Sequence, residues 1–446
     1  MSIISKDRDA NTKAWLEVLF NTYEESLNGL RSHPISTFRK NAFLQLQSER
    51  FPTRKDEDWK YTNVSPIIKA SYQQGISEEI SPDQLNEYLF EDLDVVKIVF
   101  VNGVLEKSLS TLDDIPDGVS ITSLEEALKD SAKSEVINKL VQQEGGTEVN
   151  TFLPMNLAFA RYGYLLETNK NAIIDKPFHF IYINTKNEDS HFIHPQMFIN
   201  GSSSSQLTVI ESYHTTNPEA IYFSNAANYI HVGQNAKVDH YKLQFESKSA
   251  FQINNTIVTQ ERDSEYSHYA VDLGGKIVRN NLSTQLLNSG TQTNYYGVYL
   301  GLDNQHIDNQ TFIDHAMPHC QSNEMYKGIL SDKARGVFNG KVLVRQDAQK
   351  TNAFQQSSSL VLSNTAIMDA KPQLEIYADD VKCSHGATIG QLDENSVFYL
   401  KSRGLNDEAA KNLLQKAFLG EVVTAFKIEA IKEKVLRKID DKLSRV

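Results

Sequence analysis

Cysteine is nearly absent from this sequence, which contains two in 446 residues. So few cysteines exclude a disulfide framework, and their scarcity is typical of proteins in a reducing compartment. The first residues also lack the apolar core of a signal peptide and the arginine- and serine-rich character of a transit peptide. We therefore expect a cytoplasmic protein.

Long apolar runs and an excess of basic charge are missing as well. No stretch approaches the roughly 20 apolar residues that a membrane-spanning helix needs. The 45 Lys and Arg against 57 Asp and Glu give a net charge of -12, so nucleic acids and anionic membranes are not expected partners. With 40% hydrophobic residues the chain is expected to fold, and 446 residues are too many for one ordinary core.

The motifs of several enzyme classes are absent. Gly336–Lys341 resembles a phosphate-binding loop, but it lacks one spacer residue and the hydroxyl residue that would contact Mg²⁺. We expect a turn between strands there. Neither a dinucleotide-binding glycine motif nor a Gly-x-Ser-x-Gly nucleophile elbow is present.

The middle of the chain, from about residue 171 to 398, repeats. Turn signals at positions 234, 263, 289, 318 and 347 are 26 to 29 residues apart, and asparagines at 254, 280, 309 and 339 form a second, interleaved series. The segments between them are rich in Val, Ile, Tyr and Thr, which is typical of strands. Two strands and two turns per period predict a parallel β-helix, with a large antiparallel sandwich as the alternative.

The N-terminal region is expected to be helical from about Thr12 to Ala70, with a break at Pro34. Within it, the charged segment Phe51–Asn63 reads as a structured loop that locks its aromatic residues against a neighbouring domain, or alternatively as a docking surface. Residues 90–150 combine short strands with a helix near Leu124–Gln143, which suggests a small α/β subdomain.

The C-terminal region is expected to be helical after Gly404, with Asn406 as N-cap and Gly420 separating two helices. One helix face carries Leu413, Leu414 and Phe418, and such an apolar stripe needs a partner surface, either the β-helix itself or another protein. We therefore divide the chain into residues 1–150, 151–400 and 401–446.

The stretch Gln373–Gly404 contains the most suggestive pair of side chains. It begins as an alternating strand, and Cys383 and His385, two residues apart, would share one face. If the alternation continues through Asp379–Asp380, that face is the outer one. Lys382 and a protonated His385 would lower the thiol pKa. The pair suits a metal, but alone it has too few ligands for an iron–sulfur cluster. A buried structural cysteine is the alternative.

A second group of possible ligands is less convincing. His315 and His319 are four residues apart and Cys320 is adjacent, which resembles a zinc motif. Pro318 excludes the helix that this spacing requires, so we expect a turn of the solenoid instead.

Several segments resemble one known family. They are Lys371–Gly390 with its Cys-Ser-His sequence, Phe398–Gly404, Arg335–Lys341, Asp347–Thr351 and Pro52–Thr62. On these segments the chain is similar to the SufB/SufD family, the scaffold proteins of the SUF system for iron–sulfur cluster assembly. The Gly-Ala-Thr after His385 is the form found in the SufD members. The resemblance covers essentially the whole chain and is least distinctive over residues 71–150.

The resemblance implies a fold, partners and a site. The implied fold is mainly β: a right-handed parallel β-helix between N- and C-terminal helical domains. The implied partners are the paralogous scaffold SufB, paired at the β-helix end, and the ATPase SufC, bound by the C-terminal helical domain; the isolated chain has the further option of a homodimer. The implied SufC-binding residues are Leu413, Leu414, Phe418 and Phe426. His385, with Cys383 beside it, matches the candidate ligand of a transient iron–sulfur cluster shared with SufB.

The function expected from these points is that of a non-enzymatic scaffold whose site is completed by a partner. ATP-driven closure of SufC subunits would strain the scaffold pair and expose the Cys383/His385 edge. The alternative from another class is a β-helix carbohydrate-active lyase or hydrolase, with Asp303, Asp308 and Asp314 as candidate carboxylates. A third possibility is a structural subunit in which the pair is inert.

Overall fold

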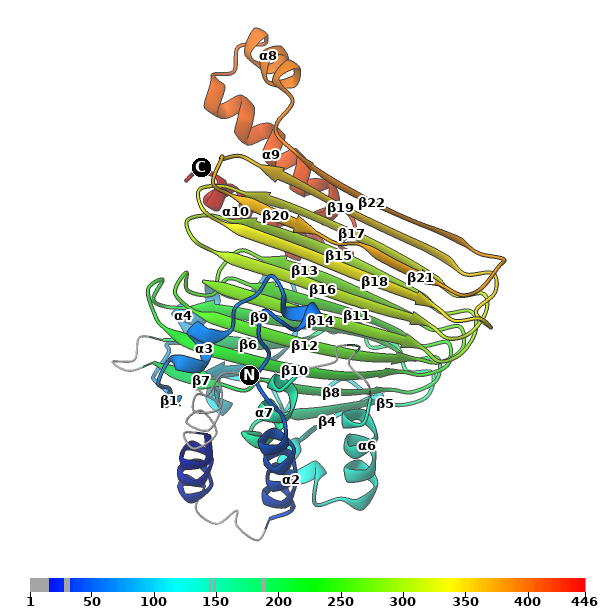
Figure 1. Ribbon diagram of the computed structural model, residues 1–446. Coiled ribbons are helices and arrows are strands. Elements are labelled where there is room, and N and C mark those ends of the chain that lie inside the picture. Colours follow the sequence, from blue (N-terminus) through cyan, green and yellow to red (C-terminus); the bar gives the residue numbers. More distant parts are fainter. Residues whose placement is uncertain (1–15, 28–32, 144–145, 147–149, 186–189, 446) are drawn as a thin grey trace.

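The computed structural model describes residues 16–27, 33–143, 146, 150–185 and 190–445. Most of them form a parallel β-solenoid of about eight turns (Figure 1). Successive strands alternate between two sheets, and neighbouring strands along the solenoid pair in parallel. The predicted parallel β-helix is thereby confirmed, and the antiparallel sandwich is excluded.

The two sheets, here called sheet A and sheet B, have 12 and 10 strands. Sheet A contains β1 (Gln73–Gln74), β4 (Val119–Ser123), β5 (Tyr164–Thr168), β7 (His191–Ile193), β8 (Gln196–Gly201), β10 (Tyr222–Val232), β12 (Phe251–Gln260), β14 (Ile277–Leu286), β16 (His306–His315), β18 (Arg335–Val344), β20 (Ile367–Ala370) and β21 (Gln373–Ile376). Sheet B contains β2 (Val96–Val101), β3 (Val104–Leu105), β6 (Phe178–Asn184), β9 (Gln206–Thr215), β11 (Lys237–Gln244), β13 (Glu265–Asp272), β15 (Gln292–Gly301), β17 (Gln321–Leu330), β19 (Asn352–Val361) and β22 (Lys382–Gly390).

The asparagine series lies inside strands, so the prediction that it marks turns was wrong. Asn254, Asn280 and Asn309 are register partners on β12, β14 and β16. The Asn280 amide donates to the Asn309 side-chain oxygen at 2.9 Å. This bond satisfies some of the side-chain hydrogen-bonding groups that these asparagines place in the interior. Asparagine favours turns in general, but a ladder of stacked amides also satisfies its hydrogen bonds within a sheet.

The segment Gly336–Lys341 was also wrongly predicted as a turn, because it lies within β18. Its glycines have a packing role. A Cβ on Gly336 would approach Leu330 and Met368 to below 3.0 Å, and one on Gly340 would approach Gln355 to 2.8 Å. The missing side chains therefore make room for neighbours inside the solenoid.

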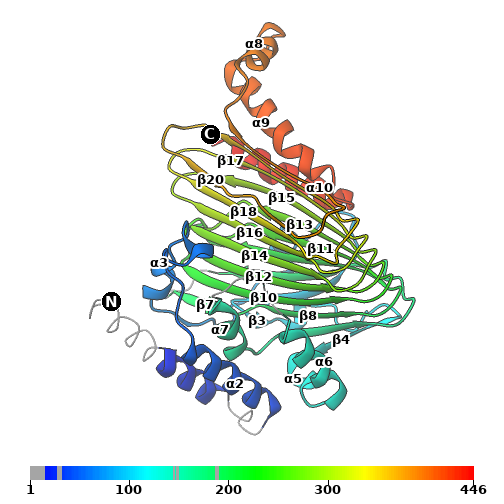
Figure 2. The ribbon, with the colours of Figure 1, turned by 45° about the vertical axis from the view of Figure 1, so that its right-hand side comes forward.

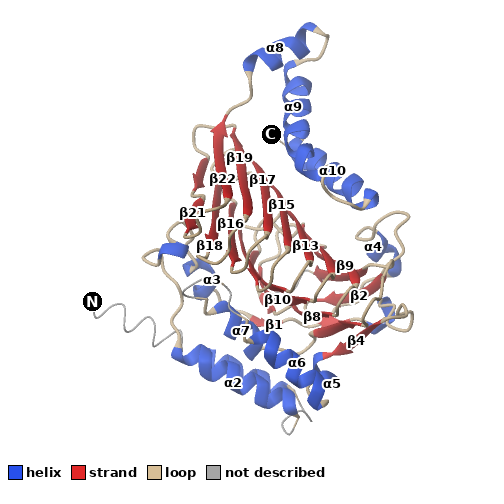
Figure 3. Cartoon of the chain, turned by 90° about the vertical axis from the view of Figure 1, so that its right-hand side faces the viewer, coloured by secondary structure: helices blue, strands red, loops and turns tan. Residues whose placement is uncertain are grey.

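Most of the N-terminal helices cover the outer face of sheet A (Figure 3), but those that carry Leu85 and Leu109 pack against β2 and β6 of sheet B. The N-terminal helices are residues 16–26, α2 (Pro34–Ser48), α3 (Ser65–Lys69), α4 (Pro82–Asn86), α5 (Leu124–Ala127), α6 (Ser131–Val141) and α7 (Phe152–Ala158), with 3₁₀ turns η1 (Glu57–Trp59) and η2 (Lys107–Leu109). Thr12, where the predicted helix begins, lies outside the described residues. The single helix predicted at Leu124–Gln143 is two helices, because Asp130 caps the start of α6.

The predicted small α/β subdomain is not a separate sheet. β2 pairs in parallel with β6, and β4 pairs antiparallel with β5, so both strands extend the sheets of the solenoid. The predicted boundary at residue 150 remains a prediction, as does the one at 400, which falls within a helix, α8 (Glu394–Ser402).

The segment predicted to lock its aromatic residues against a neighbouring domain does so through Trp59, which is fully buried. The guanidinium of Arg279, on β14, lies 3.7 Å from the centre of the Trp59 ring. Arg279 also pairs with Asp308 at 2.6 Å, and Thr62 donates a hydrogen bond to the same carboxylate. A buried charged pair is tolerated because both partners are hydrogen-bonded here.

The C-terminal helices α9 (Asp407–Val423) and α10 (Glu429–Leu443) pack against the outer face of sheet B, whereas α8 stands clear of the strands (Figures 1 and 2). Asn406 caps α9 as predicted, since its side chain accepts a hydrogen bond from the Ala409 amide at 2.7 Å. The prediction that Gly420 separates two helices was wrong. It lies within α9, and the break comes after Val423.

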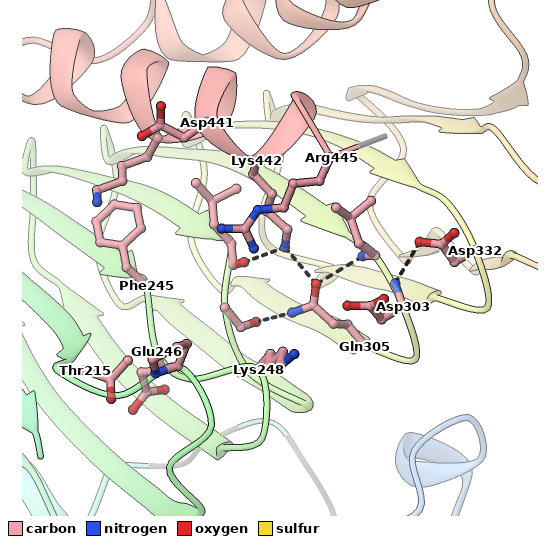
Figure 4. A pocket seen from close by; sticks show the side chains of 15 residues that line it. Thr215, Phe245, Glu246, Lys248, Asp303, Gln305, Asp332, Asp441, Lys442 and Arg445 are labelled. Carbon is pink, nitrogen blue, oxygen red and sulfur yellow. Dashed lines mark hydrogen bonds between the residues drawn. The ribbon is translucent and has the colours of Figure 1, made fainter. Parts of the chain in front are cut away.

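A partly buried lysine fixes the end of α10 on the turns of the solenoid. Lys442 donates to the carbonyls of Leu273 and Leu300 (2.5 Å for Leu300) and to the side-chain oxygen of Gln305 at 2.7 Å. Burial lowers its pKa to about 7. Lys442, Leu273 and Gln305 line a cavity of about 450 Å³ (Figure 4). Over the described part of the chain, no helix is long and apolar enough to cross a membrane.

Candidate functional site

The two ends of the solenoid differ. At the first turns, antiparallel strands flank the sheets, with β3 beside β2 and β4 beside β5. At the last turn, β22 pairs with β19 and, among the described residues, has no strand on its other edge. An exposed edge strand offers a row of backbone donors and acceptors to another chain.

The apolar interior is also uncovered at this end. Met368, Leu374 and Val381 pack against the central core yet remain partly exposed, and Ile389 on β22 is 52% exposed. Solenoids need a terminal cap over such a layer. Since α8 stands clear of the strands, no described helix covers this end (Figure 3).

Cys383 and His385 lie on β22, and both face inward. Their register partners on β19 are Ala353 and Gln355, which are buried inside the solenoid, and paired residues in a parallel ladder point to the same face. The predicted outer face was therefore wrong. The alternation does not continue through Asp379–Asp380, because the chain leaves β21 after Ile376 and enters the other sheet at Lys382.

The environment of the Cys383 thiol opposes the predicted lowering of its pKa. The side chain is half-buried against the core, and this burial raises the pKa, with a backbone hydrogen bond from Ala353 acting in the opposite direction. Neighbouring Lys382 is exposed and alternates to the other face of the strand. A metal at this thiol must therefore displace a proton.

Below His385 an unusual row of polar side chains runs into the solenoid. The register connects six inward-facing positions on successive strands of sheet B: His240, His268, Tyr295, Glu324, Gln355 and His385. The first five are at most 5% exposed. We call this set the interior polar row. A β-solenoid interior is normally apolar, since each buried polar group must find a partner.

Glu324 is the acidic member of the row, and sequence reasoning missed it. It accepts a hydrogen bond from Thr311, on the opposite sheet, at 2.9 Å and one from Gln355 at 3.2 Å. Burial raises its pKa to about 8. The sequence repeat could have revealed it. Gln355 follows Glu324 by about one period, and His385 follows Gln355 by about one more, so aligning the repeats by their turns would have placed the three residues in one row.

The predicted partner-binding residues of the C-terminal helices separate into two groups. Leu413 is 47% exposed, and Leu414 and Phe418 are partly exposed, with the Lys327 amino group 4.6 Å from the Phe418 ring. Phe426 is 1% exposed and packs edge-on against Tyr241 and Tyr269 of sheet B. Phe426 therefore attaches the C-terminal helices to sheet B and is not accessible to a partner.

The alternative metal and enzyme sites are not assembled. His315 is buried and bonded to Ser322 at 2.9 Å, while His319 lies in the expected turn. No group of three or more His, Cys, Asp or Glu side chains suited to a metal is found among the described residues. Of the three candidate carboxylates, Asp308 and Asp314 are each paired with an arginine at 2.6 Å, and Asp303 lies in a turn.

Two family models match consecutive parts of the chain. Residues 10–180 match the SufBD protein N-terminal region, and residues 182–418 match the SufBD core domain of SUF system FeS cluster assembly. The chain belongs to the SufBD family. The second match covers the solenoid from the end of β6 onward and extends into α9. Iron–sulfur cluster assembly is therefore the process in which this SufBD protein acts.

Individual relatives agree with this assignment over most of their length. The chain is 34% identical to the iron–sulfur cluster assembly protein SufD of Escherichia coli, over 90% of this chain and 91% of that protein. It is 33% identical to an iron–sulfur cluster assembly SufBD family protein of Synechocystis, over 86% of each chain. SufD of Bacillus subtilis is 27% identical over 92% of this chain and 95% of its own.

Proposed function

We propose that this SufBD protein is a non-enzymatic scaffold that supplies half of an iron–sulfur assembly site, Cys383 and His385, at the open end of its solenoid. A SufB-type scaffold pairs with that end and supplies the other half. The observation that carries the proposal is the position of the two side chains: they face inward on an edge strand whose outer edge is unpaired, in a coil without a cap among the described residues.

The ligand chemistry supports a shared site. A thiolate and an imidazole both bind iron, and a cluster requires about four protein ligands, mostly thiolates. The described part of this chain provides no third His, Cys, Asp or Glu in a metal-binding group with the pair. A second chain joined along β22 would bring the missing ligands and also cover the exposed apolar coil.

The C-terminal helices suit the binding of the ATPase SufC. Leu413, on the first turns of α9, and Phe398 on α8 are 47% and 73% exposed, and such apolar side chains on a projecting element mark an interaction surface. The rest of α9 contacts β15 and β17. A movement of SufC during its ATP cycle would be passed through α9 to β15 and β17, and from β17 through β19 to β22.

Co-expression and copurification test this proposal. With affinity-tagged wild-type chain, we expect SufB and SufC to be retained in a stable complex. A charged substitution at the edge of the open coil, Ile389→Asp, should release SufB and leave SufC bound, whereas Leu413→Asp should do the reverse. Lys382→Asp, on the same strand but the opposite face, is the control. Wild-type chain that retains neither protein would contradict the proposal. The cytoplasmic location and the homodimer remain predictions.

A further inference from the structure

We propose that Glu324 and Gln355, with His385 at the mouth, form an inner site for a divalent first-row metal ion that prefers oxygen and nitrogen ligands, such as Fe²⁺ or Mn²⁺. The inference rests on the proposed function, since it adds an inner position to the same open end. It differs from the edge site in its ligands, which are a carboxylate and an amide in place of a thiolate.

Position is the first support. Glu324, Gln355 and His385 are successive members of the interior polar row, on β17, β19 and β22. Adjacent strands are about 4.8 Å apart, so the three side chains occupy a short column that begins at the exposed end and leads inward. His385 is exposed, Gln355 is 3% exposed and Glu324 is 1% exposed.

Unsatisfied oxygen atoms are the second support. Thr311 and the Gln355 amide both donate to the same carboxylate oxygen of Glu324, Oε2. The other oxygen, Oε1 of Glu324, and the Oε1 of Gln355 are buried without any hydrogen-bond partner. A buried acceptor without a donor is destabilising. Two such oxygens, on side chains that are hydrogen-bonded to each other, are the ligand type that hard divalent cations take.

Missing charge compensation is the third support. No lysine, arginine or histidine acts on the pKa of Glu324, which burial raises to about 8. The other titratable groups that face it are Tyr295 and Tyr326, whose own pKa values burial raises well above 10.0, so they stay neutral. An ionised Glu324 carboxylate would have no positive charge beside it. A metal ion that enters past His385 would provide that charge and would displace the proton of the Glu324 carboxyl group.

Glu246 offers a matched comparison. It is also a buried carboxyl, 5% exposed, its pKa is also raised to about 8, and its Oε1 also lacks a partner. It lies in the cavity beneath α10 (Figure 4), and the positive charge that acts on its pKa is that of Lys242. A variant of Glu246 therefore removes the same charge from the protein without affecting the column below His385.

The test is Mn²⁺ binding to the full chain, followed by the electron paramagnetic resonance signal of free Mn²⁺ at pH 8. We expect one ion to bind wild-type protein, with affinity at least tenfold weaker in Glu324→Gln and in Gln355→Leu. Glu246→Gln should bind as wild type does, and so should Cys383→Ala, because Mn²⁺ does not need the thiolate. Affinity should rise up to tenfold from pH 7 to pH 8 as the proton is displaced.

Equal Mn²⁺ affinity in wild type, Glu324→Gln and Gln355→Leu would overturn the inference, and Glu324 would then be a neutral buried acid bonded to Gln355. Thermal unfolding identifies a variant that fails to fold. If one of Glu324→Gln and Gln355→Leu fails, the Mn²⁺ affinity of the other decides the test. Co²⁺ separates the two proposals: its thiolate absorption should be lost in Cys383→Ala and kept in Glu324→Gln. The proposed function fails independently, if neither SufB nor SufC copurifies.

Discussion

At the scale of single residues, the face on which Cys383 lies decides its chemistry. The sequence identified Cys383 and His385 as a pair, because a two-residue spacing places side chains together on any strand. It could not identify the face, because Asp379–Asp380 continues the alternation in the sequence while the chain turns into the other sheet. The inward orientation half-buries the thiol and so raises its pKa.

Because its pKa is raised, the Cys383 thiol should react slowly with alkylating reagents, at a rate that depends on pH. In a Cys320→Ala background, which leaves Cys383 as the one cysteine, iodoacetamide should react slowly at pH 7 and about tenfold faster for each pH unit until the thiol titrates. The sign follows from burial, which disfavours the thiolate. The His385→Ala variant should give the same profile. A rate that is already maximal at pH 7, or that depends on His385, would show an activated thiolate instead.

The same reasoning explains why Glu324 and Gln355 were missed. Neither belongs to a local motif, and each is 29 to 31 residues from its neighbours in the interior polar row. Glutamate and glutamine are usually exposed, so nothing in their own segments indicates burial. Only the register of whole turns places them below His385.

At the scale of elements, the C-terminal helices contain two kinds of apolar residue that the sequence could not separate. Helical spacing grouped Leu413, Leu414 and Phe418, which remain exposed or partly exposed, and Asn406 marked the start of α9. The residues that face the sheet and those that remain exposed share the same periodicity, however, and the sheet itself is needed to tell them apart. Gly420 was wrongly predicted to separate two helices because a helix that is stabilised by packing tolerates one glycine.

Phe426 and Leu413 should therefore respond differently to substitution by alanine. Phe426→Ala removes a ring buried against Tyr241 and Tyr269, and we expect the free energy of unfolding to fall by about 3–5 kcal/mol. Leu413→Ala, at an exposed position, should change it by less than about 1 kcal/mol and should weaken the binding of SufC. Chemical denaturation and a SufC binding assay check both. Equal stability of the two variants would contradict this division.

At the scale of the whole molecule, the period of the strands predicted the architecture, because parallel stacking imposes a nearly constant number of residues on each turn. The polar interior was not predictable, since it depends on contacts between the two sheets, such as Thr311 with Glu324. The attachment of the N-terminal segment was partly predictable. Its aromatic and charged composition suggested a lock, but the partner of Trp59, Arg279, is about 220 residues away.

The two ends of the solenoid differ in whether further strands flank the sheets. Antiparallel strands flank the first turns, and the last turn presents exposed apolar residues, Cys383 and His385, and a strand whose outer edge is unpaired among the described residues. Under the proposed function, another chain covers that end. The central claim is therefore that the cluster site belongs to the pair of scaffolds and not to this protein alone.

Anaerobic cluster reconstitution tests that claim most directly, with iron and sulfide supplied to the isolated chain and to its complex with SufB and SufC. The visible absorption of the cluster should appear in the complex and be absent from the isolated chain. In the complex it should be lost with His385→Ala and strongly reduced with Cys383→Ala, while Ser384→Ala, on the opposite face of β22, should leave it intact. A full cluster yield with both His385→Ala and Cys383→Ala would contradict the account.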